Sequence, residues 1–208
     1  MQTAVPPTFG QTISQPTTVK LMLSWLDAMP GDEVLDVGSG SGWTTTLLAH
    51  IVGPQGTVYA VERIPELVKF GRDNCRRLGI ENAFFFQARR EYGLREHAPY
   101  ARILVSASAL ELPVELLEQL AIPAKLVIPV QYDVLEVTKT AEDEYRTRTH
   151  PGFAFVPLVC QLAQPAAVVA ACGCRKPARP GRIGCSAPAG GRDRRTTGPR
   201  TIVAFAGG

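Results

Sequence analysis

The chain of 208 residues lacks any apolar run of membrane-spanning length, because nowhere do about 18 apolar residues occur together. Its first residues, Met1 to Pro7, also lack the basic region and the apolar run of a secretory signal. Hydrophobic residues make up 45% of the sequence, which suits one soluble domain of ordinary size with a full core. The composition therefore predicts a cytoplasmic protein that does not enter a membrane.

Metal ligands are also scarce. The three histidines, His50, His97 and His150, are far apart in the sequence, and none has a second ligand at helical spacing. Cys172 and Cys174 have no matching Cys-x-x-Cys pair and no histidine nearby. The sequence therefore predicts no metal site.

Acidic residues almost disappear after residue 159. Residues 160–208 contain 8 Lys and Arg but the single acid Asp193, whereas residues 1–159 contain 14 Lys and Arg and 18 Asp and Glu. Ala, Gly, Pro and Arg dominate the later segment, which shows neither helical nor strand periodicity. We therefore expect a folded domain over 1–159 and a disordered, basic, low-complexity tail over 160–208. The tail's arginines have no interleaved aromatics, which favours a solvated extension over a nucleic-acid site.

The most informative stretch runs from Glu33 to Trp43. Its apolar residues up to Val37 suit a buried strand of a parallel sheet, and a helical pattern follows Trp43. Between them, Gly38, Gly40 and Gly42 remove the side chains that would keep a ligand from the backbone. A strand, a glycine-rich loop and a helix in this order are typical of a nucleotide-cofactor site. The alternative is a turn that binds nothing.

Spacing separates two classes of cofactor. A dinucleotide fingerprint, Gly-x-Gly-x-x-Gly, would place its third glycine at position 43, where this chain has Trp43. Asp36, at the carboxyl end of the strand, can form an ion pair with an ammonium group but would repel a pyrophosphate. Because the methionine end of S-adenosylmethionine carries an amino group, the pattern favours S-adenosylmethionine over NAD.

A second acid follows the next predicted strand. The run Thr57–Val61 ends at Glu62, twenty residues after Gly42. A carboxylate at this place can accept hydrogen bonds from both ribose hydroxyls, which NAD and S-adenosylmethionine share. Glu62 therefore supports a cofactor without choosing between the two, and its alternative role is a solvated acid at a helix start.

The remaining pattern alternates strands and helices. Further strands are predicted at 83–86, 103–105 and 125–128, and helices at 16–28, 44–52, 65–79 and 113–120. This order predicts a Rossmann-like α/β fold, a doubly wound and mostly parallel sheet with helices on both faces. The segment from Tyr132 to Val159 predicts a closing antiparallel pair or three strands.

Six segments occur in the order and spacing of a known family. They are Gln11-Thr12-Ile13-Ser14-Gln15-Pro16 and residues 34–42, 61–67, 96–100, 126–130 and 155–158. With these segments the chain, from about residue 8 to residue 159, resembles the protein-L-isoaspartate O-methyltransferases, a family of class I S-adenosylmethionine-dependent methyltransferases. The first segment is the specific one, because the glycine loop and the ribose acid occur in many methyltransferases.

The resemblance implies a repair enzyme that moves a methyl group from S-adenosylmethionine to the α-carboxyl group of isoaspartyl residues in damaged proteins and peptides. It implies that Ser14 is the active-site serine. A carboxylate is already a competent nucleophile, so the reaction needs alignment and exclusion of water rather than a general base. Ser14 could also simply cap the helix that begins near Pro16. The implied cofactor residues are Thr12, Asp36, Gly38, Ser39, Gly40, Gly42, Glu62, Arg63 and Arg89.

The chain also departs from the family pattern. Ala88-Arg89-Arg90 stands where the family usually has Gly-Asp-Gly, so that a hydrogen-bond donor replaces the acceptor near the adenine. Ala101 and Ala154 replace an acid and a base, and only nine residues precede Gly10 where the family has a helical segment. These departures leave two alternatives open, a methyltransferase of the same fold with another acceptor and a cofactor-binding relative without turnover.

Overall fold

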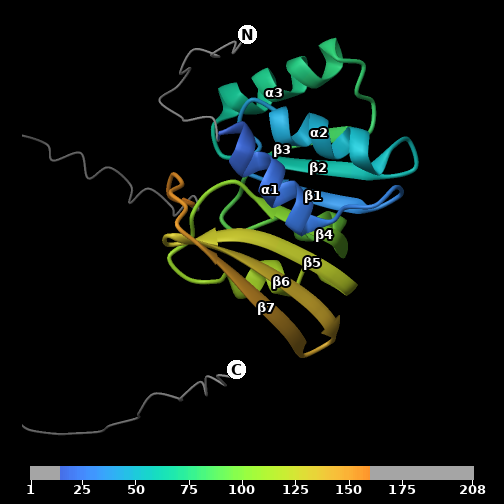
Figure 1. Cartoon of the computed structure of the whole chain (residues 1–208). Helices are drawn as coiled ribbons and strands as arrows, with labels where there is room; N and C mark the ends of the chain where they lie inside the picture. The colour runs from blue at the N-terminus through green and yellow to red at the C-terminus, as the bar shows by residue number, and fades with distance from the viewer. Residues whose placement is uncertain (1–14, 160–208) are drawn as a thin grey trace, which may run out of the picture. The chain divides into compact units, whose positions relative to one another are not determined.

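The computed structural model describes residues 15–159, which are built on one seven-stranded sheet (Figure 1). The strand order is β3-β2-β1-β4-β5-β6-β7. Neighbouring strands from β3 to β5 are parallel, whereas β6 and β7 are antiparallel to the strands beside them. This arrangement confirms the predicted mostly parallel α/β sheet with antiparallel closing strands.

The elements follow the alternation that the sequence predicts. The strands are β1 (Glu33–Val37), β2 (Thr57–Glu62), β3 (Ala83–Gln87), β4 (Tyr100–Val105), β5 (Leu120–Val130), β6 (Asp133–Ala141) and β7 (Glu144–Pro151). The helices are α1 (Pro16–Leu26), α2 (Trp43–Val52), α3 (Pro65–Arg77) and α4 (Val114–Leu117), and the 3-10 turn η2 (Arg95–His97) precedes β4.

The three long helices all pack on one face of the sheet. Met22 of α1 and Leu48 of α2 share a buried cluster with Val58 of β2. Val68 of α3 packs with Ala60, two residues further along β2 and therefore on the same face. Figure 1 shows α1 and α2 in front of the strands that they cover.

The opposite face is covered by shorter elements. Leu35, Ile103 and Leu126 from three strands form a core with Leu94, in the β3–β4 connection, and with Leu116 of α4. Helices therefore lie on both faces, as predicted, but the second face carries only the single turns η2 and α4 and a loop.

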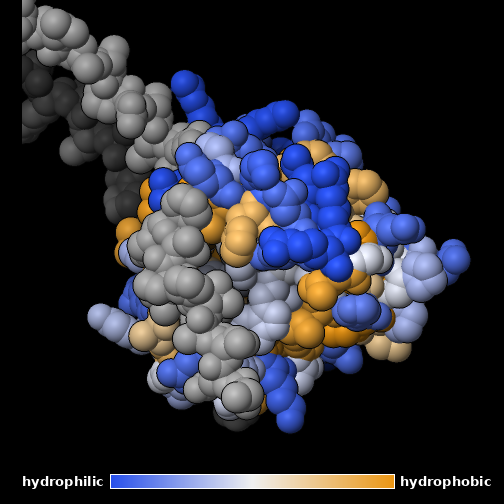
Figure 2. Space-filling view, turned by 90° about the horizontal axis from the view of Figure 1, so that it is seen from above, coloured by the Kyte–Doolittle hydropathy of each residue, from blue (hydrophilic) through white to orange (hydrophobic). Residues whose placement is uncertain are grey.

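The outer side of α3 is hydrophilic. Its exposed residues include Glu66, Lys69, Arg76 and Arg77. Figure 2 looks onto the molecule from above and shows hydrophilic side chains over much of this view. The helix is thus amphipathic, and its apolar side supplies the contacts with the sheet.

Two predictions about the second half of the domain are corrected. The helix predicted over 113–120 is the short α4, and β5 begins at Leu120 rather than at Lys125. Leu120 pairs with Tyr100 of β4, a contact across the sheet that local sequence does not reveal. Of the two alternatives predicted for the end of the domain, the antiparallel pair β6–β7 is the one observed, and Pro157 in residues 153–159 makes an isolated bridge to Ser108.

The strand order places a crevice at the carboxyl end of β1. Val37, the last residue of β1, pairs with Val61 of β2 on one side and with Val105 of β4 on the other. The chain leaves β1 towards β2, and β4 enters on the opposite side, so the order reverses at this strand. In open α/β sheets, ligands bind at such a reversal, outside the carboxyl ends of the strands.

Candidate functional site

The glycine loop, residues 38–42, closes over the end of β1. Gly38, Gly40 and Gly42 have φ values of 79°, 51° and 78°, in the left-handed region that side chains disfavour. The amides of Gly38 and Ser39 both donate to the carbonyl of Val61, at 2.8 and 3.2 Å. The loop is therefore shaped by main-chain conformation and main-chain hydrogen bonds.

Close packing against α3 makes the third glycine indispensable. A Cβ on Gly42 would lie 2.9 Å from the carbonyl oxygen of Gly71 in α3, closer than such atoms approach. A Cβ on Gly71 would in turn meet the ring of Phe85 at 2.7 Å. The two glycines thus let the loop, α3 and β3 approach one another.

Asp36 lies behind the loop and is fully buried. Its Oδ2 accepts hydrogen bonds from the hydroxyls of Thr44 at 2.9 Å and Thr45 at 2.7 Å, both in the first turn of α2. Its Oδ1 has no hydrogen-bond partner among residues 15–159. Burial, with a smaller contribution from the Glu62 charge, raises the pKa of Asp36 to about 6.

The burial of Asp36 defines its contacts within the protein, and its predicted contact with an ammonium group stays a prediction. Asp36 is not among the residues that line the cavity described below. Its carboxyl group instead fastens the strand end to α2 and places charge underneath the glycine loop when it is ionised.

Glu62, at the end of β2, is held from two sides. One carboxylate oxygen accepts the amide of Gly40 at 3.1 Å, and the other accepts the amide of Ile64 at 2.9 Å. The side chain is mostly buried, yet it lines the cavity. Each oxygen keeps a lone pair for a further donor, so the carboxylate is preorganised to accept hydroxyl groups.

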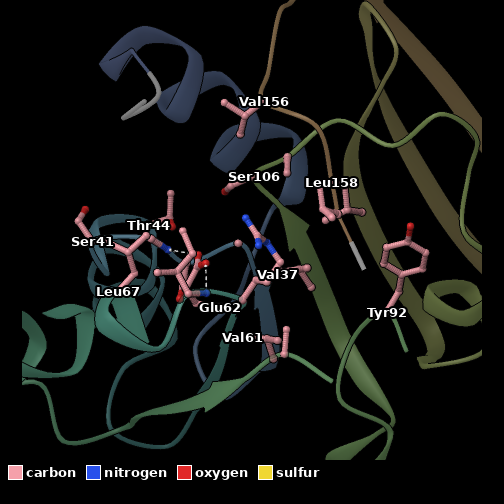
Figure 3. Close-up of a pocket in the computed structure, with 18 of the residues that line it drawn as sticks. Val37, Ser41, Thr44, Val61, Glu62, Leu67, Tyr92, Ser106, Val156 and Leu158 are labelled. Atoms are coloured by element: carbon pink, nitrogen blue, oxygen red, sulfur yellow. Dashed lines mark hydrogen bonds between the residues drawn. The ribbon is translucent and has the colours of Figure 1, made fainter. Parts of the chain in front are cut away.

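A cavity opens between these elements and the end of the domain (Figure 3). Its empty volume is about 1240 Å³, which includes space open to solvent. One side carries the glycine loop, Thr44, Glu62 and Leu67, and the other carries Tyr92, Ser106 and the residues from Val156 to Val159 (Figure 3). The cavity therefore brings together residues from the first half of the domain and from its end.

The wall opposite the glycine loop is the closing segment, residues 153–159. Ser108, just after β4, donates its amide to the carbonyl of Val156 at 2.8 Å and accepts the amide of Leu158 at 2.7 Å. The hydroxyl of Ser108 also donates to the carbonyl of Gln131 at 2.9 Å. These bonds hold the segment across the ends of β4 and β5.

A buried glutamine holds the loop that brings Tyr92 to the cavity. The side-chain amide of Gln119 accepts the amide of Leu94 at 2.8 Å and donates to the carbonyls of Tyr92 at 2.8 Å and Glu115 at 2.7 Å. Gly93 lies between these contacts with φ of 88°, and a Cβ there would come within 2.4 Å of the Gln119 side chain. Gln119 therefore fixes the backbone of the loop that carries Tyr92.

The predicted cofactor residues fall into three groups. Gly38, Ser39, Gly40, Glu62, Arg63 and Arg89 line the cavity together. Asp36 and Gly42 lie behind it, where they support the loop. Thr12 and Ser14 lie outside the described residues.

Two of the lining residues add detail to the prediction. Ser39 is 4% exposed, and its hydroxyl has no hydrogen-bond partner within the described part of the chain. Arg89 has an exposed side chain whose guanidinium pairs with Glu96 at 3.2 Å. A buried unpartnered hydroxyl at a cavity wall is a polar group that a ligand can satisfy.

Sequence reasoning did not identify Tyr92 and Ser106 as lining residues. Nothing in their local sequence marks them, because they reach the cavity through the loop held by Gln119 and through the end of β4. Val156 and Leu158 carried a signal, since they belong to the family-like segment 155–158, but no role was predicted for them.

Within the described residues, no group of three or more His, Cys, Asp or Glu side chains is placed to hold a metal ion. No helix between residues 15 and 159 has the length and apolar character needed to cross a bilayer.

A family model adds an independent observation. The model described as Protein-L-isoaspartate(D-aspartate) O-methyltransferase matches residues 1–163. The chain belongs to the protein-L-isoaspartate O-methyltransferase family. The family that the motifs suggested is thereby confirmed.

Curated members of the family align over most of the chain. The protein-L-isoaspartate O-methyltransferase of Pyrococcus horikoshii is 43% identical over 160 residues, which are 74% of this chain and 72% of that protein. Its counterpart in Methanothermobacter thermautotrophicus is 40% identical over 164 residues, 76% of each chain.

Solved structures agree with the family assignment. A Plasmodium falciparum chain described as a protein-L-isoaspartate O-methyltransferase in complex with S-adenosyl-L-homocysteine has a TM-score of 0.64 at 30% identity, over 76% of this chain and 81% of that one. A second protein-L-isoaspartate O-methyltransferase has a TM-score of 0.66 at 25% identity, over 71% of this chain and 48% of that one. The predicted methyltransferase fold is therefore confirmed.

Proposed function

We propose that this family member transfers the methyl group of S-adenosylmethionine to the α-carboxyl group of isoaspartyl residues in damaged proteins and peptides. The observation that carries the proposal is the single cavity that joins a glycine loop, a preorganised Glu62 and the closing segment. A family match over residues 1–163 supports the same activity.

The residues of the cavity fit S-adenosylmethionine. Glu62 is positioned to accept the ribose hydroxyls, and the glycine loop leaves its backbone open to the ligand. The unpartnered Ser39 hydroxyl offers a further polar contact. Arg63 and Arg89 lie at the cavity wall as donors. When bound, the cofactor supplies a methyl group on a positively charged sulfur, a strong electrophile.

The protein's own contribution is alignment and exclusion of water. Val37, Val61, Leu67 and Leu158 give the cavity an apolar lining, which excludes solvent around the reacting groups. Asp36 supports the loop from behind, and its partial negative charge near neutral pH suits a cationic ligand. No group of the chain has to remove a proton from a carboxylate nucleophile.

We propose Ser14 as the residue that orients the acceptor carboxylate, with one carboxylate oxygen held by its hydroxyl. Helix α1 begins at Pro16, and its N-cap position is Gln15, which makes no side-chain capping hydrogen bond. The capping position is thus the residue after Ser14, an observation that favours the orienting role over the capping role.

The decisive experiment is methyl transfer from radiolabelled S-adenosylmethionine to an isoaspartyl peptide and to its normal aspartyl twin. We expect label in the isoaspartyl peptide alone. Label in neither peptide would contradict the activity, and label in an unrelated acceptor would favour another methyltransferase of the same fold.

A parallel titration tests the cofactor site itself. S-adenosylhomocysteine should raise the melting temperature, since a ligand at about 100 times its dissociation constant adds about 2.7 kcal/mol to the free energy of unfolding. Glu62→Ala should weaken this shift, whereas Glu66→Ala, an exposed acid on α3, should leave it unchanged. Equal shifts in both variants would place the cofactor elsewhere.

We also propose that residues 1–159 form the methyltransferase domain, that residues 160–208 are a low-complexity tail, and that the protein is cytoplasmic. The charge asymmetry of the sequence supports the division of the chain.

A further inference from the structure

An aromatic cluster joins the end of α1 to the start of the closing segment. The rings of Trp25 and His150 stack with centroids 3.8 Å apart and planes 10° apart. The ring of Phe153 meets the Trp25 ring edge-on, with the two centroids 5.8 Å apart. We call these three residues the clasp.

The clasp is anchored on both sides by polar contacts. His150 Nε2 lies 3.4 Å from the Glu136 carboxylate of β6, and that carboxylate also lies 3.6 Å from Lys125 Nζ of β5. Lys125 Nζ is 3.5 Å from the carboxylate of Asp27, directly after α1.

Main-chain bonds fix the start of the closing segment. The amides of Gly152 and Phe153 both donate to the carbonyl of Tyr132, at 3.1 and 2.9 Å. The start of the closing segment is therefore fixed at one place.

From the clasp, α1 and the closing segment run side by side to the cavity. Phe153 and Phe155 pack on the same apolar cluster as Met22. From Trp25 back to Val19, α1 covers about 9 Å, at 1.5 Å per residue. From Phe153 to Val156, an extended chain covers about 10 Å. Val19 and Val156 both line the cavity. Figure 3 shows Val156 beside a blue helical ribbon, the colour of α1 in Figure 1.

Helix α1 and the closing segment thus meet at the clasp, and each contributes a residue to the cavity lining. A change in the ring contacts of the clasp can therefore shift both elements, although none of the three clasp residues lines the cavity itself.

We propose that Trp25, His150 and Phe153 are positioning residues for the acceptor substrate, which hold α1 and the closing segment at the spacing that an isoaspartyl peptide requires. This inference rests on the proposed function. It assigns no such role toward the cofactor, because the glycine loop and Glu62 are held by contacts that do not involve the clasp.

The test compares two histidines that each stack on an aromatic ring. His150→Ala removes the clasp stack, and His97→Ala removes the stack of His97 on Tyr59, 4.6 Å between centroids, on the opposite face of the sheet. We expect His150→Ala to raise the KM for an isoaspartyl peptide by about fivefold or more while the Kd for S-adenosylhomocysteine changes less than about twofold. His97→Ala should leave the KM within about twofold.

A rescue variant separates positioning from general stability. His150→Phe keeps a ring that stacks on Trp25 but loses the contact with Glu136. In this variant the KM should return most of the way to the wild-type value. If KM and Kd rise together in His150→Ala, or if His97→Ala raises the KM equally, the inference is overturned. Failure of the wild-type protein to bind S-adenosylhomocysteine would instead contradict the proposed function.

Amide hydrogen exchange tests the clasp without any turnover. The Leu158 amide, which donates to the carbonyl of Ser108, should exchange faster in His150→Ala and not in His97→Ala. Unchanged exchange at this amide would overturn the inference, whatever the activity of the protein.

Discussion

The two walls of the cavity are held in different ways. The glycine loop depends on positive φ values, on main-chain bonds to Val61 and on the close approach of Gly71. The closing segment depends on one main-chain bond to Tyr132, on two main-chain bonds to Ser108 and on the ring contact of Phe153 with Trp25. We call the side with the glycine loop the cofactor wall and the side with the closing segment the acceptor wall, as the proposed function has them. The cofactor wall tolerates almost no change of conformation, whereas the acceptor wall is held partly by Trp25 and Phe153, which lie outside the cavity lining.

The largest effect is expected at Gly42 in the cofactor wall, and Gly53, a glycine outside both walls, is its control. Gly42→Ala should cost more than about 3 kcal/mol of unfolding free energy, because the new Cβ meets both a positive φ and the backbone of Gly71. Gly53→Ala has a similar φ of 64° but nothing within 4 Å, so it should cost only about 1–2 kcal/mol. Urea unfolding measures both variants, and equal losses would contradict the packing argument.

The role proposed for Ser14 predicts the next largest effect. If its hydroxyl orients the substrate carboxylate, Ser14→Ala and Ser14→Asn should each slow methyl transfer by roughly a hundredfold, about 3 kcal/mol, at saturating cofactor. Cofactor affinity should change little. Near-normal rates in a folded Ser14→Ala protein, with a melting temperature restored by Ser14→Asn, would point to helix capping instead.

Asp36 provides a pH test of the cofactor wall. Because its folded pKa of about 6 lies above the ordinary value of 3.8, the folded state holds the proton more tightly than the unfolded state. The stability contribution is complete below about pH 4 and is lost as the pH rises through about 6, by up to about 3 kcal/mol. The free energy of unfolding of the wild type should therefore fall relative to Asp36→Asn between pH 4.5 and 7.5. Parallel pH profiles for the two proteins would refute this assignment.

The smallest expected effect lies outside both walls. Removal of residues 160–208 should change the free energy of unfolding by less than about 0.5 kcal/mol and leave S-adenosylhomocysteine binding intact, because the segment lacks the apolar periodicity of a packed element. Thermal unfolding and ligand titration of the shortened protein measure this. Loss of cooperative unfolding would show that the segment is part of the folded domain.

The cofactor wall was the more predictable of the two. The alternation of Gly38, Gly40 and Gly42 after an apolar run is a local pattern, and its meaning depends on the backbone of the same few residues. Glu62 followed from the next strand for the same reason. The burial of Asp36 behind the loop was not predicted, since it depends on Thr44 and Thr45 in the following helix.

The acceptor wall was harder to predict because distant residues build it. Ser106 and Tyr92 reach the cavity only through the strand order and through the contacts of Gln119. The start of β5 at Leu120 likewise follows from its pairing with Tyr100, and a helix prediction from residues 113–120 alone cannot include that pairing. Local periodicity identifies elements, whereas the site needs the pairing between them.

Gln119 has a consequence for how this protein can diverge from its relatives. Its side-chain amide bonds to the main chain of Tyr92 and Leu94, and it leaves no room for a Cβ on Gly93 between them. Substitutions at the neighbouring positions 88–91 therefore alter the charge of the cavity rim while the course of the loop is retained. Because Gln119 and Tyr100 hold this loop through its main-chain atoms, a change of side chain along it can alter ligand preference and leave that anchor in place.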